Sequence, residues 1–198
     1  AEGLIRSGVE HLHIVDSDRV CVTNINRQAQ ATAKTVGQHK VEALKNRLAE
    51  IRPKADIEAT CGIYSAETAG AFDLDRYDYV IDAIDSISCK VELITRTLSS
   101  RATLFSAMGA ACKLDPTRIQ VGSFWKTKGC PLARIIRKKL RDLGVRDDFV
   151  CVHSDENLEQ FAPEIACGSG DCVCPEVEGE DSHEWCSAKK QINGSAVH

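Results

Sequence analysis

The sequence lacks several features that define whole classes of protein. Among its 198 residues, no uninterrupted apolar run approaches the ~20 residues that a helix needs to cross a membrane, so we expect no membrane partner. No basic, apolar and small-residue series opens the chain, and therefore no secretory signal is visible. The ten cysteines include no C-x-x-C pair. These absences favour a cytoplasmic protein whose cysteines are free thiols.

The composition is not strongly basic either. The chain has 25 Lys and Arg residues and 29 Asp and Glu residues, which gives a net charge of −4. This average hides two unequal parts. Residues 1–154 hold 23 basic and 19 acidic residues, whereas residues 155–198 hold two basic and ten acidic residues. The basic body keeps nucleic-acid binding open, although the net charge argues against it.

Short apolar runs alternate with helical patterns through residue 101. We expect strands at 11–15, 56–60, 79–81, 103–105 and 118–121, and helices at 36–52, 65–71, 89–98 and 131–143. The alternation predicts an α/β, Rossmann-like fold with a mostly parallel sheet and helices on both faces. Residues 125–198 add a basic helix, an irregular acidic loop and the start of a C-terminal strand to this fold. Because the chain begins inside a helical pattern and stops in a turn, we expect a fragment that lacks elements at both ends.

Polar residues follow two of the expected strands. Asp16-x-Asp18 ends the strand at 11–15, and Asp82-x-x-Asp85-Ser86 ends the strand at 79–81. In parallel sheets, ligands bind outside the carboxyl ends of the strands, where a carboxylate accepts hydrogen bonds from ribose hydroxyls. Magnesium prefers one or two carboxylates together with phosphate oxygens. The two clusters therefore predict a site for ATP and magnesium.

Cationic residues lie between these clusters. Arg27 follows Asn24 by three positions, and Lys40 ends a G-x-x-K run. Arg and Lys neutralise phosphate oxygens, and together with magnesium they stabilise charge that develops at phosphorus during attack by a carboxylate. Each residue alone is better explained as a solvated turn, a surface charge or a helix cap. Only the ordered set favours a nucleotide site.

In this order, the motifs D-x-D, T-N-x-N-R-Q, G-x-x-K and D-x-x-D-S closely resemble the adenylating domain of the ubiquitin-activating-like superfamily, which includes ThiF, MoeB and HesA proteins. The resemblance makes residues 1–124 an ATP-binding adenylating domain whose glycine-rich phosphate loop belongs ahead of residue 1. It implies that Asp16 binds ribose and that Ser86 lies beside the nucleotide. It also implies phosphate contacts by Asn24, Arg27 and Lys40 and a magnesium ligand at Asp85, with catalytic roles for Arg27, Lys40 and Asp85.

Within the superfamily, four stretches are most similar to the tRNA threonylcarbamoyladenosine dehydratases: residues 79–86, 114–121, 126–133 and 151–156. This resemblance implies a tRNA substrate and ATP-dependent activation of the threonylcarbamoyl carboxylate, after which a neighbouring nitrogen closes a ring. It also implies a homodimer, and for some relatives a sulfur-transfer partner.

A basic stripe supports an RNA partner. Four residues recur at helical spacing in the helix expected at 131–143: Arg134, Arg137, Lys138 and Arg141. Such a stripe binds phosphates without regard to sequence and in a salt-sensitive way. A merely solvated helix face explains the spacing equally well, so both interpretations stay open.

Two other functions are left open. In one, the adenylated substrate is the C-terminal glycine of a ubiquitin-like sulfur carrier; the missing C-x-x-C zinc pairs and the basic stripe argue against it. In the other, the chain is a noncatalytic scaffold, which the retained Arg27, Lys40 and Asp85 argue against.

The cysteines give weaker signals. Cys130 and Cys151 are candidates by position for a thioester or persulfide, and His153 would share a strand face with Cys151, but core packing explains all three more simply. A four-thiolate zinc site at Cys167, Cys172, Cys174 and Cys186 has no standard spacing, so free thiols are favoured there.

Overall fold

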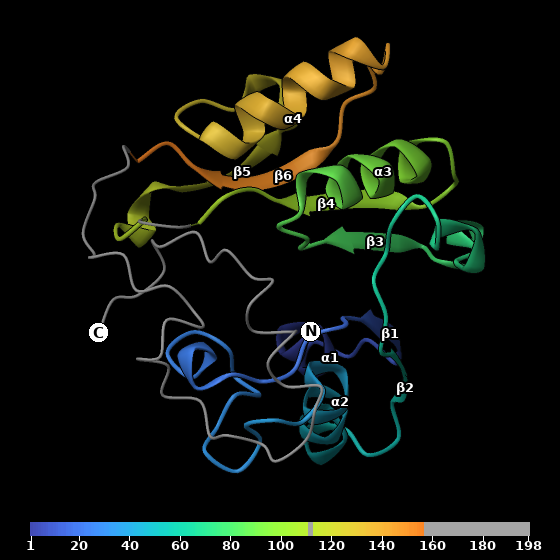
Figure 1. The fold of residues 1–198 in the computed structure, drawn as a ribbon, viewed down its shortest axis with the longest axis vertical. Helices are drawn as coiled ribbons and strands as arrows, with labels where there is room; N and C mark the ends of the chain where they lie inside the picture. The colour runs from blue at the N-terminus through green and yellow to red at the C-terminus, as the bar shows by residue number, and fades with distance from the viewer. Residues whose placement is uncertain (111–112, 157–198) are drawn as a thin grey trace, which may run out of the picture. The chain divides into compact units, whose positions relative to one another are not determined.

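The computed structural model describes residues 1–110 and 113–156 (Figure 1). The described residues form two compact units, residues 1–63 and residues 64–156, and each is described by itself. Each unit carries its own sheet, of two and of four strands. The expected acidic loop beyond residue 156, the four cysteines considered for zinc and the expected C-terminal strand lie outside the described residues.

The first unit, unit 1, is a small βαβ arrangement. Its elements are α1 (Glu2–Arg6), β1 (His11–Val15), the 3-10 turn η1 (Val22–Asn24), α2 (Lys40–Ile51) and β2 (Asp56–Thr60). β1 and β2 are parallel, with His11 opposite Asp56. Helix α1 ends shortly before Gly8, whose φ of 101° suits glycine. Ile5, Leu48 and Ile57 form the buried core between the two helices and the sheet.

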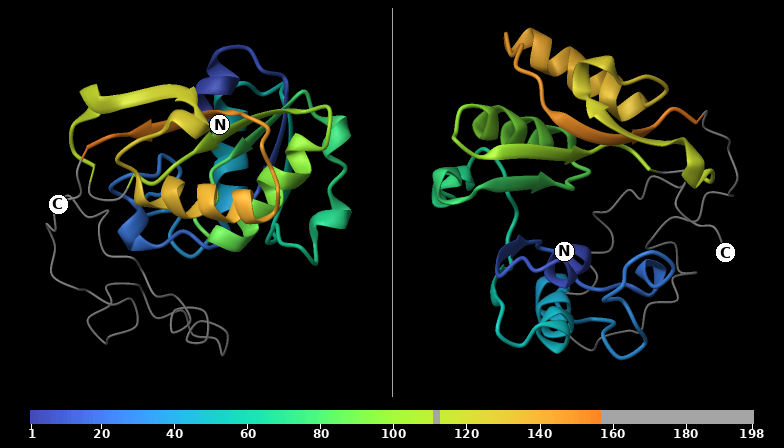
Figure 2. Two further views of the ribbon diagram at one scale, coloured as in Figure 1. Left: turned by 90° about the horizontal axis from the view of Figure 1, so that it is seen from above. Right: turned by 180° about the vertical axis from the view of Figure 1, so that it is seen from behind.

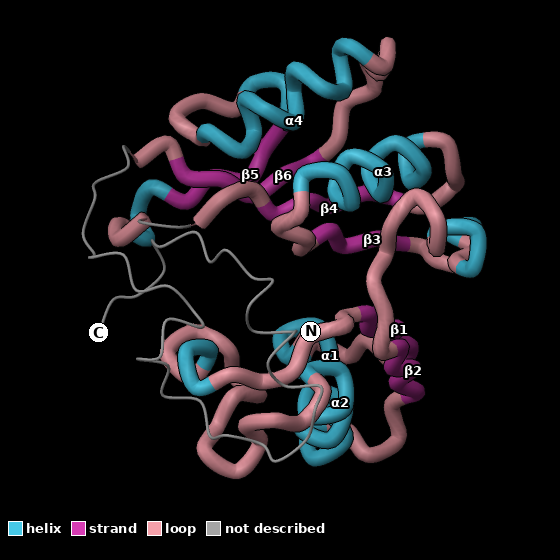
Figure 3. The backbone as a smooth tube through the Cα atoms, in the orientation of Figure 1, coloured by secondary structure: helices cyan, strands magenta, loops and turns pink. Residues whose placement is uncertain are grey.

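The second unit, unit 2, contains a mixed four-stranded sheet in the order β3-β4-β6-β5 (Figure 3). The pairs β3–β4 and β4–β6 are parallel, and β5–β6 is antiparallel. Its strands are β3 (Tyr79–Asp82), β4 (Thr103–Ala107), β5 (Ile119–Ser123) and β6 (Val150–Ser154), and its helices are α3 (Ile87–Leu98) and α4 (Pro131–Asp142). Short 3-10 turns lie at η2 (Ala69–Ala71), η3 (Leu74–Arg76), η4 (Pro116–Arg118) and η5 (Phe124–Lys126).

Helices α3 and α4 cover the same face of this sheet (Figures 1 and 2). Apolar residues from both helices and from β4 and β6 form one core there, including Ile94, Leu104, Ile136, Leu140 and Cys151. The predicted α/β class with parallel strands is thus confirmed. The helices expected on both faces are found on one face of unit 2.

The opposite face of the sheet, called the open face below, carries no charged strand residue. From the strand register its residues are Tyr79, Ile81, Thr103, Phe105, Ala107, Val150, Val152, Ser154, Ile119, Val121 and Ser123. Several of their large apolar side chains are exposed, with Val121 at 69% and Tyr79 at 65%. A broad apolar surface of this kind is typical of an interaction site.

Three sequence predictions differ from the structure. The helix expected at 65–71 is wrong apart from the single turn η2, because Ser65 starts a hydrogen-bonded turn instead. Helix α2 begins at Lys40 rather than near residue 36, because Gly37 has a φ of 86° and His39 pairs with Arg19 in an extended bridge. Strand β6 was not expected as a sheet member.

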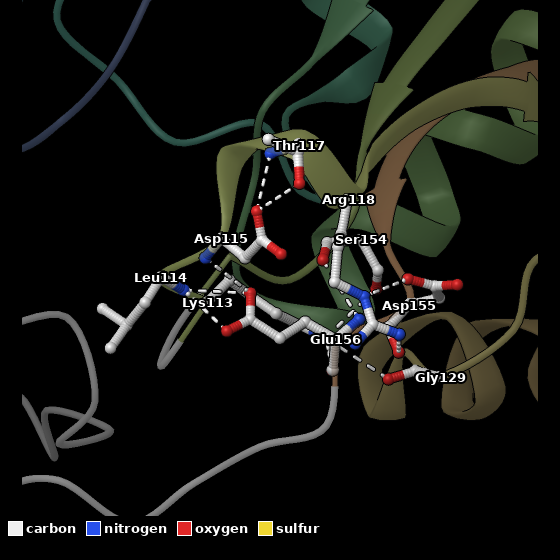
Figure 4. Close-up of polar contacts among 9 residues, drawn as sticks. All are labelled: Lys113, Leu114, Asp115, Thr117, Arg118, Gly129, Ser154, Asp155 and Glu156. Carbon is white, nitrogen blue, oxygen red and sulfur yellow. Dashed lines mark hydrogen bonds and ion pairs between the residues drawn. The ribbon is translucent and has the colours of Figure 1, made fainter.

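A polar latch ties the end of β6 to the turn before β5 (Figure 4). The Glu156 carboxylate accepts hydrogen bonds from the backbone N–H groups of Leu114 and Asp115 at 3.0–3.1 Å. The Lys113 ammonium donates to the carbonyl oxygens of Ser154, at 3.1 Å, and of Glu156. Two chain segments about 40 residues apart are thereby held together, which the sequence pattern alone did not reveal.

No helix in the described ranges is long and apolar enough to cross a membrane.

Candidate functional site

In unit 1, the residues at the carboxyl end of β1 meet the start of α2. The Lys40 ammonium lies 2.8 Å from the Asp18 carboxylate, and the two side chains are only 13% and 24% exposed. The Lys40 backbone N–H also donates to the Asp18 carbonyl at 2.9 Å. Asp18 therefore fixes the position of Lys40, whose ammonium has three hydrogen-bond donors and can share them with a phosphate.

Asp16 lies beside this pair. One oxygen of its carboxylate accepts a hydrogen bond from the Asp18 backbone N–H at 2.7 Å, which orients the carboxyl group at the strand end. The Asp16 backbone N–H donates to the Thr60 carbonyl at the end of β2. The structure thus brings Asp16 and Lys40 together at one strand end, where the sequence predicted a nucleotide site.

The loop between Asp18 and Lys40 carries the other two residues expected in unit 1. Asn24 is buried, and its side-chain oxygen accepts the Cys21 backbone N–H at 3.0 Å. Its own carbonyl accepts the backbone N–H groups of Arg27 and Gln28. Asn24 therefore shapes the loop, and Arg27, an exposed residue, has its guanidinium 2.7 Å from the Thr23 carbonyl.

In unit 2, Asp85 and Ser86 are exposed in the loop between β3 and α3. Ser86 is the N-cap residue of α3, but its side chain makes no capping hydrogen bond and instead lies 3.3 Å from the Ser88 hydroxyl. The Asp85 carboxylate is thus presented at the end of β3, close to a helix N-terminus that favours anions.

Asp82 has a different role from its neighbour Asp85. It is completely buried, and its carboxylate lies 2.8 Å from the ammonium of Lys90, which is also completely buried. Ser106 on β4 donates to the same carboxylate at 2.5 Å, and the Lys90 ammonium also donates to the Ile84 carbonyl. This polar cluster holds the β3–α3 loop in place and leaves Asp85 as the exposed carboxylate of the motif.

Lys90 is the residue that the sequence analysis missed. A signal was present, because Lys90 falls at helical spacing between Ile87 and Ile94 on the buried face of α3. A lysine in an apolar stripe needs a buried partner, and the aspartate at the preceding strand end supplies it.

The four residues of the predicted basic stripe differ in their surroundings. Arg134, Lys138 and Arg141 are exposed on α4, and the Arg141 guanidinium lies 5.6 Å from the centre of the Trp125 ring. Arg137 is half-buried: its guanidinium donates to the Thr127 carbonyl at 2.7 Å and lies over the Phe124 ring. Arg137 thus anchors α4 to η5, and three of the four cations face solvent.

The two cysteines considered as nucleophiles are buried. Cys151 is 0% exposed, and burial raises the pKa of its thiol to about 11. Cys130 is 6% exposed, and its sulfur accepts the Ala133 backbone N–H at the start of α4. Burial also lowers the pKa of His153, on the same face of β6 as Cys151. These environments agree with the expected core packing of all three residues.

No group of three or more Cys, His, Asp or Glu side chains suited to a metal ion occurs among residues 1–110 and 113–156. These described residues therefore contain no site at which protein side chains alone would hold a metal ion. A single carboxylate such as Asp85 fits magnesium only where phosphate oxygens and water complete the coordination.

Comparisons with known proteins connect this geometry to a family. The tRNA threonylcarbamoyladenosine dehydratase of Bacillus subtilis (strain 168) is 43% identical over 157 residues, which cover 79% of this chain and 62% of the relative. The crystal structure of the E. coli enzyme TcdA in complex with ATP matches with a TM-score of 0.76 and 35% identity, covering 79% of this chain and 68% of that chain.

A sulfur-related relative is less similar. The adenylyltransferase and sulfurtransferase MOCS3 of Culex quinquefasciatus is 30% identical over 112 residues, which cover 57% of this chain and 25% of the relative. The chain also spans less than two thirds of the length of the B. subtilis relative. The sequence model of the ThiF family matches residues 1–144, well over half of the chain. On these grounds, the chain belongs to the ThiF family.

Proposed function

We propose that the full-length protein is an ATP-dependent tRNA modification enzyme that adenylates the carboxylate of threonylcarbamoyladenosine and drives its cyclisation. The match to the ATP complex of the E. coli dehydratase, over 79% of this chain at 35% identity, carries the proposal. The cluster of Asp16, Asp18 and Lys40 at the end of β1 supports it, because these groups suit a ribose and a phosphate chain.

The proposed reaction has two steps. A carboxylate oxygen of the substrate attacks the α-phosphorus of ATP, so that an acyl–phosphate bond forms and pyrophosphate leaves. A nitrogen of the threonylcarbamoyl group then attacks the activated carbonyl carbon, so that a carbon–nitrogen bond closes the ring and AMP leaves. The nitrogen loses its proton, and the net change in the substrate is the loss of one water.

The residues of unit 1 have distinct roles in this proposal. Asp16 accepts hydrogen bonds from the ribose hydroxyls, while Lys40 and Arg27 neutralise phosphate oxygens and stabilise charge at the reacting phosphorus. The Asn24 side-chain oxygen accepts the Cys21 backbone N–H, and this hydrogen bond stabilises the loop that carries Arg27. Asp18 holds the Lys40 ammonium in position through their ion pair.

In unit 2, Asp85 is the proposed magnesium ligand, and Ser86 lies beside the nucleotide. The Asp85 carboxylate is exposed, which supports this assignment. The nearby Asp82 carboxylate is buried in an ion pair with Lys90, so it is not accessible to a metal ion. When bound, magnesium would neutralise phosphate charge.

The tRNA partner is assigned to the exposed cations of α4. Arg134, Lys138 and Arg141 lie on one face of the helix, since positions i, i+4 and i+7 coincide on a helical surface. Their interaction with RNA phosphates would be independent of base sequence. The proposed location is the cytoplasm, where tRNA substrates are present.

A homodimer is the proposed assembly, and the open face of unit 2 supports it, because a broad uncharged surface favours burial against a second copy. A Val121→Asp change should shift the full-length protein from dimer to monomer in light scattering. A wild-type protein that is monomeric at the same concentration would contradict the assembly. A sulfur-transfer partner is also proposed, on the resemblance to the superfamily.

The experiment that separates the two adenylation substrates is pyrophosphate exchange. The full-length protein is incubated with ATP and labelled pyrophosphate, once with tRNA containing threonylcarbamoyladenosine and once with a ubiquitin-like sulfur carrier. Exchange that depends on the modified tRNA is expected. Exchange that depends only on the carrier would replace the proposal with the sulfur-carrier function, and exchange with neither would favour a noncatalytic scaffold.

A further inference from the structure

An exposed cysteine and a histidine face each other in unit 1. Cys61 directly follows β2, and its sulfur lies 3.1 Å from Nδ1 of His39. His39 is the N-cap residue of α2, but its ring makes no capping hydrogen bond and is directed to the thiol instead. A nucleophile within hydrogen-bond reach of a base is the arrangement that activates thiols in proteins.

The backbones of both residues are held in place by their surroundings. The His39 backbone is fixed by its bridge to Arg19 and by the start of the 12-residue helix α2. The Cys61 backbone continues β2, whose end is joined to β1 through the Asp16 N–H and the Thr60 carbonyl.

The other cysteines of the described ranges differ from Cys61. Cys21, Cys130 and Cys151 are buried, and Cys89 is half-buried. Metal binding is not an alternative here, because no third Cys, His, Asp or Glu joins the pair to form a metal-binding group in this part of the chain. Among the described residues, Cys61 thus combines exposure with an adjacent base.

We propose that Cys61 and His39 form a covalent modification site at which the thiol of Cys61 adds to soft carbon electrophiles while His39 accepts its proton. With iodoacetamide, the sulfur–carbon bond forms as the carbon–iodine bond breaks, and iodide leaves with the bonding electron pair. The thiol proton passes to Nδ1 of His39 and then to water. No oxidant or reductant takes part.

The position of the site also has a consequence that rests on the proposed function. His39 is the chain neighbour of Lys40, so an adduct on Cys61 lies beside the residue assigned to the ATP phosphates. Alkylation at Cys61 should therefore weaken ATP binding, and the Cys61→Ser protein should keep its ATP affinity after the same treatment. Equal ATP affinity before and after complete alkylation would refute this consequence while leaving the thiol chemistry standing.

The chemistry itself is tested without nucleotide. The full-length protein is treated with limiting iodoacetamide, and the alkylation rate of each cysteine is measured by peptide mass spectrometry. Cys61 should react faster than Cys89, and His39→Gln should slow Cys61 by about 10²-fold, the lower end of general-base assistance. His11→Gln, which alters an exposed histidine on β1, is the matched control and should leave the rate unchanged.

Folding is monitored in the same experiment, because the buried Cys21 stays unlabelled only while unit 1 is folded. Circular dichroism reports on the chain as a whole. Two results would overturn the proposal: a Cys61 rate no higher than that of Cys89, or the same Cys61 rate in the wild type and in a folded His39→Gln variant.

Discussion

At the scale of single residues, the buried pair of Asp82 and Lys90 decides how the second carboxylate motif is used. Both side chains are fully buried, and Ser106 completes the hydrogen bonding of the carboxylate. Two aspartates three positions apart thus have opposite environments, one internal and one facing solvent. The separation gives Asp82 a structural role and leaves the Asp85 carboxylate exposed to solvent, as the proposed magnesium ligand must be.

Removal of the lysine should be costly. Lys90→Met leaves the Asp82 carboxylate buried without its cation, so the free energy of unfolding should fall by about 3–5 kcal/mol. Urea denaturation of the full-length protein measures this change. Lys139→Met, at an exposed position of α4, is the control and should change stability by less than about 0.5 kcal/mol. An equal decrease in the free energy of unfolding in the two variants would show that the buried ion pair does not stabilise the fold.

His153 should give the stability a defined pH dependence. Burial lowers the pKa of its imidazole in the folded chain, and this outweighs the opposite influence of Asp155. The unfolded chain, with a histidine pKa of about 6.5, then binds a proton more readily than the folded one, so stability falls as the pH drops below that value. The His153→Gln variant should show a smaller loss between pH ~7.5 and ~5.5 in thermal unfolding. A loss as large as that of the wild type would contradict the assignment.

The sequence predicted which residues share a site only where several motifs occur in a recognisable order. Asp16 and Lys40 were expected in one site, and they meet through Asp18 at the end of β1. The contact between Cys61 and His39 was not predictable from the sequence. The two residues are 22 positions apart, and their contact depends on how β2 packs beside the start of α2.

At the scale of secondary-structure elements, the latch between β6 and the turn before β5 depends on a glycine. Gly129 has a φ of 67°, and a Cβ there would lie 2.6 Å from the Asp155 carbonyl oxygen. The Asp155 carboxylate in turn lies 2.9 Å from the Arg118 guanidinium. A side chain at position 129 would therefore push against the segment that the latch holds.

Gly129→Ala should destabilise the protein by more than the ~1–2 kcal/mol that a left-handed backbone alone costs an alanine. Gly144→Ala is the matched control, because Gly144 also has a positive φ, of 76°, but a Cβ there would meet nothing within 4 Å. Thermal unfolding of both variants separates the clash from the backbone cost. Equal destabilisation would mean that the contact with Asp155 is relieved without cost.

Element boundaries followed the sequence where apolar periodicity was strong. Strands β1 and β2 have the expected bounds, and α4 begins at Pro131 as expected. The helix expected at 65–71 is wrong because local turn hydrogen bonds at Ser65 compete with a helix that has few apolar residues to bury. Strand β6 depends on pairing with β4 and β5, which no local pattern encodes.

At the scale of the whole molecule, charge is distributed in a way that the net value conceals. The exposed cations of α4 belong to the basic part of the chain, and the acidic excess lies in residues 155–198. Sequence counting was sufficient to locate this asymmetry. It did not reveal that Arg137 is turned toward Thr127, because that contact arises only when α4 packs on η5.

The tRNA affinity should therefore respond selectively to these cations. Lys138→Ala should weaken binding of tRNA to the full-length protein and reduce the slope of log affinity against log salt by about one. Lys45→Ala, at an exposed position of α2, should leave both quantities unchanged. Filter binding over a salt series measures the slope, and an unchanged slope in Lys138→Ala would remove α4 from the RNA-binding surface.

We propose that the full-length protein drives ATP-dependent ring closure on threonylcarbamoyladenosine in tRNA. The most direct test is mass spectrometry of nucleosides after the full-length protein has been incubated with ATP and the modified tRNA. A product lighter by one water, formed together with AMP, is expected. The rate should fall by about 10²-fold or more in folded Lys40→Ala, the scale on which loss of one charge-stabilising group acts, and be unchanged in Lys45→Ala. Consumption of ATP without ring closure, or a Lys40→Ala protein as active as the wild type, would contradict it.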